Sequence, residues 1–237
     1  MPDGQTERYP RAPKAACASQ KRRKRETLAE KRARAKIIGT HLEGAYPDVE
    51  CPLTHRNNFE LLVAVMLSAQ CTDAAVNRVT PALFRSFPTS PILARAPLGE
   101  IESLIRTLGL FRAKARLLKR CAQQLVEEFG GEVPTAMEEL TRLAGVGRKT
   151  ANVIRGHAFG IPGLAVDTHC KRLSRRLGFT REEDPTKIER DLSRILPPEE
   201  WTGFSHRLIL HGRKICYARK PACVRCDLRL LCPSSSV

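Results

Sequence analysis

Four cysteines near the C-terminal end of the chain are the residues best suited to chemistry. Cys216, Cys223, Cys226 and Cys232 follow the spacing C-x6-C-x2-C-x5-C, with polar, turn-forming residues between them. Four thiolates in one short loop can surround one metal centre, and thiolate sulfur selects zinc or iron–sulfur over harder ions. Structural zinc usually has two C-x2-C pairs, whereas this loop has one. The spacing therefore predicts zinc or iron–sulfur without choosing between them, and an exposed disulfide pair is a third alternative.

A lysine and an aspartate upstream could carry out covalent chemistry. Lys149 follows the glycine turn 143–147 (LAGVG) and falls beside Arg148 in the first turn of an expected helix. The helix dipole and the guanidinium both disfavour the ammonium form, so a partly desolvated Lys149 could attack carbon. The alternative is that Lys149 is an ordinary solvated surface charge with no chemical role. Asp167 precedes another expected helix, where its simplest role is an N-cap, although a cap carboxylate facing a cleft could also act as a base.

The glycine turn itself could hold a phosphate. The amides of Gly145, Val146 and Gly147, with those of the following helix, suit an anion, although a short G-x-G is more often a plain helix–helix turn. Arg148 directly after the turn favours the phosphate interpretation.

The net charge of +16 favours a polyanionic partner, nucleic acid first. Residues 1–36 hold twelve Lys and Arg against four Asp and Glu, so half of the excess lies in a tail that we expect to be disordered. The tail suits either a phosphate-binding arm or a nuclear or organellar address. No apolar run is long enough to cross a membrane, and no secretory signal is present. The five other cysteines, Cys17 among them, are expected to be reduced thiols.

Helical periodicity dominates the chain after the tail. The run 59–67 (FELLVAVML) predicts a buried central helix, and Thr72 is expected to cap the next helix. Further helices are expected at 101–108, ending at Gly109, and at 113–128, ending before Gly130. Segments 138–143, 149–159, 168–177, 185–196 and 202–215 complete an all-α fold. We expect two packed helical domains with the active cleft between them.

Several segments together resemble the endonuclease III family of DNA glycosylases and abasic-site lyases, a branch of the helix-hairpin-helix superfamily. They are 67–73 (LSAQCTD), 145–152 (GVGRKTAN), 165–169 (AVDTH), 210–213 (LHGR) and the cysteine loop, residues 216–232. The resemblance runs from about residue 28 to Cys232 in family order. Two departures are visible: Ala144 stands where the hairpin often has proline, and Cys71 follows Gln70 where alanine or threonine is usual.

The resemblance implies a [4Fe-4S] cluster on the four loop cysteines, with Lys149 as the Schiff-base nucleophile and Asp167 as the catalytic aspartate. It implies a six-helix, barrel-like domain with the hairpin at 51–161, a cluster domain at 28–50 plus 162–237, and a basic tail at 1–27. The DNA contacts that we expect are Gln70, Leu110, Gly145, Val146, Gly147, Arg148, His169, Arg219, Lys220 and Arg225.

The implied function is base excision repair. The enzyme would remove oxidised pyrimidines from duplex DNA and cut abasic sites by β-elimination. It would act as a monomer and, if the chain is bacterial, in the cytoplasm near the nucleoid. Two alternatives remain open at this stage. One is a mismatch-adenine glycosylase, a relative that shares the cluster but lacks this lysine. The other is a non-catalytic, metal-stabilised DNA-binding protein.

Overall fold

The computed structural model describes residues 26–47 and 51–237, and every regular element in these ranges is a helix. Cys17 and the basic tail up to residue 25 lie outside the described residues. The α-helices are α1 (Leu28–Ala45), α2 (Asn58–Leu67), α3 (Asp73–Ser86), α4 (Ser90–Arg95), α5 (Leu98–Leu104), α6 (Phe111–Phe129), α7 (Met137–Arg142), α8 (Arg148–Ala158), α9 (Thr168–Arg176), α10 (Pro185–Ser193) and α11 (Trp201–Lys214). Two short 3₁₀ turns, η1 (Pro198–Glu200) and η2 (Cys223–Arg225), complete the order. The expected all-α fold is confirmed.

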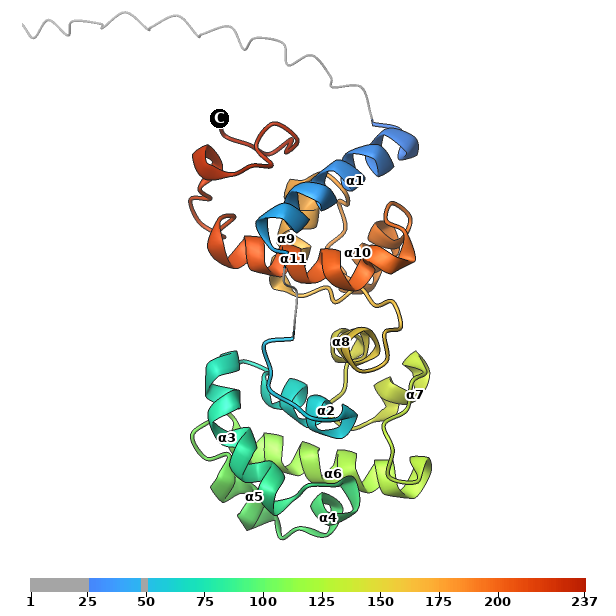
Figure 1. The fold of residues 1–237 in the computed structure, drawn as a ribbon, viewed down its shortest axis with the longest axis vertical. Coiled ribbons are helices and arrows are strands. Elements are labelled where there is room, and N and C mark those ends of the chain that lie inside the picture. The colour runs from blue at the N-terminus through green and yellow to red at the C-terminus, as the bar shows by residue number, and fades with distance from the viewer. Residues whose placement is uncertain (1–25, 48–50) are drawn as a thin grey trace, which may run out of the picture.

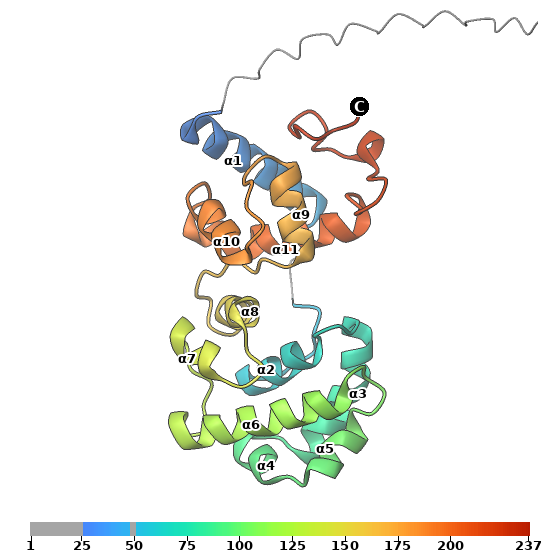
Figure 2. The same cartoon turned by 180° about the vertical axis from the view of Figure 1, so that it is seen from behind.

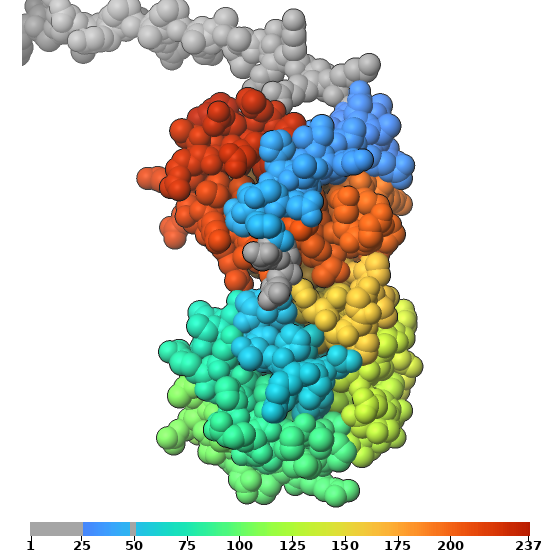
Figure 3. All heavy atoms as spheres, viewed as in Figure 1, coloured from blue at the N-terminus to red at the C-terminus, as the bar shows by residue number. Residues whose placement is uncertain are grey.

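The buried side chains form two separate clusters. The first gathers residues between Leu53 and Ile154, and the second joins residues 35–42 of α1 to residues between Leu164 and Leu228. In Figures 1 and 2, α2–α7 lie at one end of the molecule and α1 with α9–α11 at the other, with α8 between them. We call the two ends the lower and the upper lobe. The space-filling outline narrows where they meet (Figure 3).

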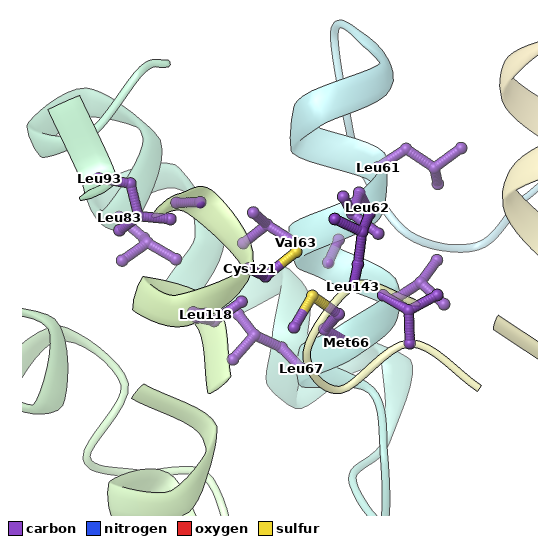
Figure 4. Close-up of a cluster of buried hydrophobic side chains, with 14 of the residues drawn as sticks. Leu61, Leu62, Val63, Met66, Leu67, Leu83, Leu93, Leu118, Cys121 and Leu143 are labelled. Carbon is purple, nitrogen blue, oxygen red and sulfur yellow. The ribbon is translucent and has the colours of Figure 1, made fainter. Parts of the chain in front are cut away.

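The lower lobe is built around α2, which is apolar on all sides. Its residues from Glu60 to Leu67 are all buried, and Leu61, Leu62 and Leu67 are inaccessible to solvent. Figure 4 shows side chains of α2 beside Leu118 and Cys121 of α6 in the same core. Burial of one such leucine stabilises the fold by about 1.5–3 kcal/mol. The central helix predicted from the apolar run is therefore confirmed.

Helix ends follow the expected caps in two places and differ in a third. The Thr72 hydroxyl accepts a hydrogen bond from the Ala75 amide at 3.2 Å, and Gly130 ends α6 in the left-handed region at φ 63°. The predicted stop at Gly109 is wrong. Helix α5 ends at Leu104, and the left-handed residue is Leu110, which immediately precedes α6. A glycine next to a turn does not by itself say which residue takes the unusual backbone conformation.

In the upper lobe, the first helix packs against the last third of the chain. Ile38 and Leu42 of α1 are buried in the same cluster as Phe204 and Leu208 of α11. The Arg34 guanidinium donates to the carbonyl of Leu177 at 2.7 Å and to that of Leu231 at 3.3 Å. Thr27 and Glu30 form a capping box at the start of α1. Residue 27, placed at the end of the tail from the sequence, thus takes part in the fold.

The lobes meet through α8 and α11. A side chain on Gly156 of α8 would come within 2.7 Å of Thr202, so only glycine permits this approach. Arg213 of α11 also pairs with Asp73 of α3 at 3.2 Å. Within the described residues, no helix is long and apolar enough to span a membrane.

Candidate active site and cysteine loop

Lys149 is the second residue of α8 and points into solvent. The helix starts at Gly147, whose backbone is extended and which supplies no side-chain cap. The first amides of α8 are therefore open to an external acceptor, and the positive end of the helix dipole lies beside the lysine. The side chain of Lys149 is exposed. The partial desolvation expected from the sequence is thus not provided by the protein alone.

The turn before α8 depends on one glycine more than on the other. Gly145 has φ 79°, and a Cβ there would meet Met66 Cε at 3.0 Å and Leu117 Cβ at 3.3 Å. Gly147 has φ −94° and open space around it. Neither its backbone conformation nor its surroundings therefore require a glycine. The Val146 amide donates to the Leu143 carbonyl at 3.0 Å inside the turn. An anion at the turn would consequently meet the amides after Val146.

Arg148 is held by a partner that lies far away in the sequence. Its guanidinium makes two hydrogen bonds to the Glu189 carboxylate on α10, at 2.6 and 2.8 Å. This contact joins the start of α8 to the upper lobe. As a DNA contact, Arg148 would have to share or release Glu189, a constraint that the sequence did not reveal.

Asp167 is the N-cap of α9, which was its simplest predicted role. Its Oδ1 accepts a hydrogen bond from the Cys170 amide at 2.7 Å, and its side chain is only partly buried. The cap uses Oδ1, so Oδ2 can take another role. His169, two residues on, accepts a hydrogen bond from the Arg172 guanidinium through Nδ1 at 3.2 Å, and its Cβ packs closely against Gly212 of α11.

Left-handed backbone marks three of the residues expected to contact DNA. Among the described residues, the only non-glycine residues with positive φ are Gln70 (56°), Leu110 (59°) and Lys220 (52°). Such a conformation costs about 1–3 kcal/mol and clusters at functional sites. Leu110 is also 61% exposed, so it does not make the apolar contact that often accompanies a glycine at a helix end. Gln70 is exposed as well.

Two arginines of α9 hold the cysteine loop against the upper lobe. Arg172 donates to the Cys216 carbonyl at 2.9 Å and to the Gly212 carbonyl at 3.0 Å. Arg176 donates to Cys216 Sγ at 3.2 Å and to the Tyr217 carbonyl at 2.7 Å. Neither arginine was among the residues predicted from the sequence to take part in the site. Their four-residue spacing places them on one face of α9 and was the available signal.

The thiols of Cys216, Cys223 and Cys232 lie close enough to Cys226 to affect its pKa. Burial raises the pKa of Cys226, and so do the nearby thiols of the other three cysteines. The pKa of Cys232 is raised by burial and by two of the same neighbours. Buried His211 lies 3.4 Å from Cys226 Sγ through Nε2 and 3.2 Å from the Tyr46 hydroxyl through Nδ1.

Four cysteine thiols are a donor set that suits zinc or an iron–sulfur cluster. Across residues 26–47 and 51–237, no three His, Cys, Asp or Glu side chains converge closely enough to hold one metal ion.

The rest of the loop surface is basic and exposed. Arg219, Lys220 and Arg225 are all solvent-accessible, and Lys220 carries the left-handed backbone noted above. Two hollows border α1, one beside Asp227 and the other beside η1, and neither includes Lys149 or Asp167.

Comparisons with known proteins agree with one another. Residues 63–198 match the model of the HhH-GPD superfamily of base excision DNA repair proteins. The chain is 52% identical to endonuclease III of Synechocystis sp. over 88% of this chain and 95% of the relative. It is 40% identical to endonuclease III of Escherichia coli, over 82% of this chain and 92% of the relative.

Solved structures give the same picture. A trapped endonuclease III–DNA covalent intermediate superposes with a TM-score of 0.81 at 45% identity, covering 86% of this chain and 96% of that one. A thermostable thymine-DNA glycosylase at 22% identity shares the fold with a TM-score of 0.77.

Proposed function

Since this chain belongs to the endonuclease III family of HhH-GPD base excision DNA repair proteins, we propose that it removes oxidised pyrimidines from duplex DNA and cuts the resulting abasic site. The observation that carries the residue assignment is the start of α8. There an exposed lysine follows directly on a glycine turn, at a helix end that no side chain caps. A phosphate on the open amides would bring the deoxyribose of the same strand to Lys149.

Lys149 is the nucleophile in this proposal. Its neutral amine attacks C1′ of the deoxyribose, and the damaged base leaves. The resulting imine acidifies the neighbouring carbon, and β-elimination then breaks the strand 3′ to the lesion. Bound DNA would supply the desolvation that the exposed lysine lacks in the free protein.

Asp167 assists at the same sugar. Its Oδ1 is fixed by the Cys170 amide, which orients the carboxylate at the start of α9. The remaining oxygen would accept a proton from Lys149 and balance the positive charge that develops on the sugar.

Gln70 and Leu110 stabilise the duplex after the damaged base has left the stack. Gln70 would enter the vacated space, and Leu110 would wedge into the opposite strand, where an apolar side chain compensates for lost stacking. The left-handed backbone that presents both side chains supports these roles. Arg219, Lys220 and Arg225 would hold backbone phosphate from the cysteine loop.

The four loop cysteines would ligate a [4Fe-4S] cluster, which supplies the covalent framework that shapes the loop. Arg172 and Arg176 anchor Cys216 and the following residues from outside. The two clusters of buried residues support a division into domains at 51–161 and at 28–50 with 162–237. The bacterial relatives support action in a bacterial cytoplasm, at the nucleoid.

Borohydride trapping on abasic DNA tests the proposal. Lys149→Ala should abolish the covalent adduct and strand cleavage while retaining the visible absorbance of the cluster. Lys187 is the matched control because it is also an exposed lysine in the first turn of a helix, α10. Lys187→Ala should trap like wild type. An adduct that survives Lys149→Ala would reject the nucleophile, and a wild-type protein that never traps would favour a monofunctional glycosylase or a plain DNA-binding protein.

A further inference from the structure

Lys114 is a buried lysine whose partner is a cysteine. Only 6% of its surface is exposed, and its ammonium lies 2.9 Å from Cys71 Sγ. Within the described residues, this is the only side-chain hydrogen bond of Lys114, and no carboxylate pairs with it there. A buried ammonium needs a compensating partner, and a thiolate is a far better acceptor and counter-ion than a thiol. The contact therefore places a cation directly against the Cys71 sulfur, which is the kind of surroundings in which a cysteine is reactive.

The same contact joins the two segments that carry the left-handed residues. Cys71 directly follows Gln70, and Lys114 lies in the first turn of α6, where its amide donates to the Leu110 carbonyl at 3.0 Å. Cys71 is thus one residue from Gln70, and Lys114 is one helical turn from Leu110.

Other thiols outside the cysteine loop are shielded by comparison. Burial raises the pKa of Cys121 and of Cys170 to about 12, and burial also raises the pKa of Cys51. Cys71 is partly exposed and is the one among these four with a lysine in contact. A thiol that is both accessible and paired with a cation is the kind that oxidants reach first.

We propose that Cys71, in contact with the buried Lys114 ammonium, is an oxidation-sensitive site whose modification by hydrogen peroxide impairs the action of Gln70 and Leu110 on duplex DNA. The thiolate sulfur attacks one peroxide oxygen, the O–O bond breaks, and the hydroxide that leaves takes a proton from the Lys114 ammonium. The products are a sulfenic acid, water and a neutral lysine. Sulfur loses two electrons, and the peroxide gains them.

Oxidation then disturbs both segments. The Cys71–Lys114 distance is already that of a direct hydrogen bond, so an added oxygen has no room between the two atoms. Once Lys114 regains its proton, it is a buried ammonium that faces a neutral sulfenic acid and has lost its counter-ion. Both effects act on the segments that hold Gln70 and Leu110, while the start of α8 is untouched. The expected loss of activity on duplex DNA rests on the function proposed above for Gln70 and Leu110.

The first test needs no DNA. The full-length protein is treated with limiting N-ethylmaleimide, or with peroxide plus dimedone, and each cysteine is followed by peptide mass spectrometry. Cys71 should react faster than Cys51, Cys121 and Cys170. Lys114→Met removes the charge at similar length and should slow Cys71 about tenfold, since the thiolate is the reacting species. Equal rates for Cys71 and the buried thiols, or an unchanged rate in Lys114→Met, would overturn the proposal.

The second test separates the two functions. After peroxide, wild type should lose cleavage of a lesion in duplex DNA while keeping most imine trapping on a single-stranded abasic site. Cys71→Ser cannot form a sulfenic acid but keeps an acceptor for Lys114, so its ratio of treated to untreated duplex activity should stay near one. An equal loss in Cys71→Ser would place the damage elsewhere, for example at the cysteine loop. Failure of trapping before any peroxide would reject the proposed function and leave the labelling result standing.

Discussion

Replacing Asp167 separates a structural role from a chemical one, because the same carboxylate caps α9 and is proposed to assist Lys149. The cap is a single hydrogen bond from the Cys170 amide to Oδ1 at 2.7 Å. Asparagine keeps an oxygen at this position and is as good an N-cap as aspartate, whereas alanine removes the acceptor. The two substitutions should therefore differ in their effect on folding stability and have the same effect on base release.

The expected magnitudes follow from these roles. Asp167→Asn loses only the attraction between the negative charge and the helix dipole, about 0.5 kcal/mol. Asp167→Ala loses about 1 kcal/mol in free energy of unfolding, which in a chain of this size lowers Tm by about 2–4 °C. If the carboxylate is the assisting base, base release should fall by about 10²–10⁴-fold in both variants.

Asp184 provides a matched control for the cap. It starts α10 in the same way, by accepting a hydrogen bond from the Lys187 amide at 3.0 Å. Asp184→Ala should destabilise the protein by a similar amount and leave turnover unchanged. The measurements are thermal unfolding and single-turnover release of an oxidised pyrimidine. Wild-type turnover in Asp167→Asn would show that the residue is a cap alone.

Three further outcomes are expected. Serine at any one of the four loop cysteines should give a colourless, poorly soluble protein, whereas serine at Cys51 or Cys121 should leave the brown colour; stoichiometric zinc without iron or sulfide would refute the cluster. Gln70→Ala and Leu110→Ala should impair duplex cleavage far more than trapping on a single-stranded abasic site, because both side chains act on the stack, and a parallel fall in Tm would instead assign them to the fold. Deleting residues 1–25 should flatten the salt dependence of DNA binding, since each phosphate contact contributes a slope of about 0.9, and an unchanged slope would show that the tail does not touch DNA.

Local rules anticipated much of the helical framework. The apolar run of α2 had to be buried on all sides, and Thr72 and Gly130 are residue types with a direct physical reason to begin or end a helix. These features depend on neighbours within a few residues, so the sequence contains them.

The remaining features depend on long-range contacts. Glu189 pairs with Arg148 from 41 residues away, and Lys114 reaches Cys71 across 43 residues. No periodicity signals such pairs. Local rules also do not predict the left-handed backbone of Leu110, because conformational preference would assign the positive φ to the neighbouring Gly109. Lys149 was expected to be partly desolvated, and its exposure became visible only when the packing around α8 was known.

The packing of α1 against the end of the chain has a consequence for synthesis on the ribosome. Arg34 reaches the carbonyl of Leu231, 197 residues later, and Ile38 and Leu42 of α1 are buried only when α11 exists. At about 5–20 residues per second, α1 waits roughly 10–40 s for its partner. During that time the lower lobe, which is contiguous in the chain, can fold as each helix emerges. We therefore expect the apolar face of α1 to be the surface on which a nascent chain of this protein engages a chaperone.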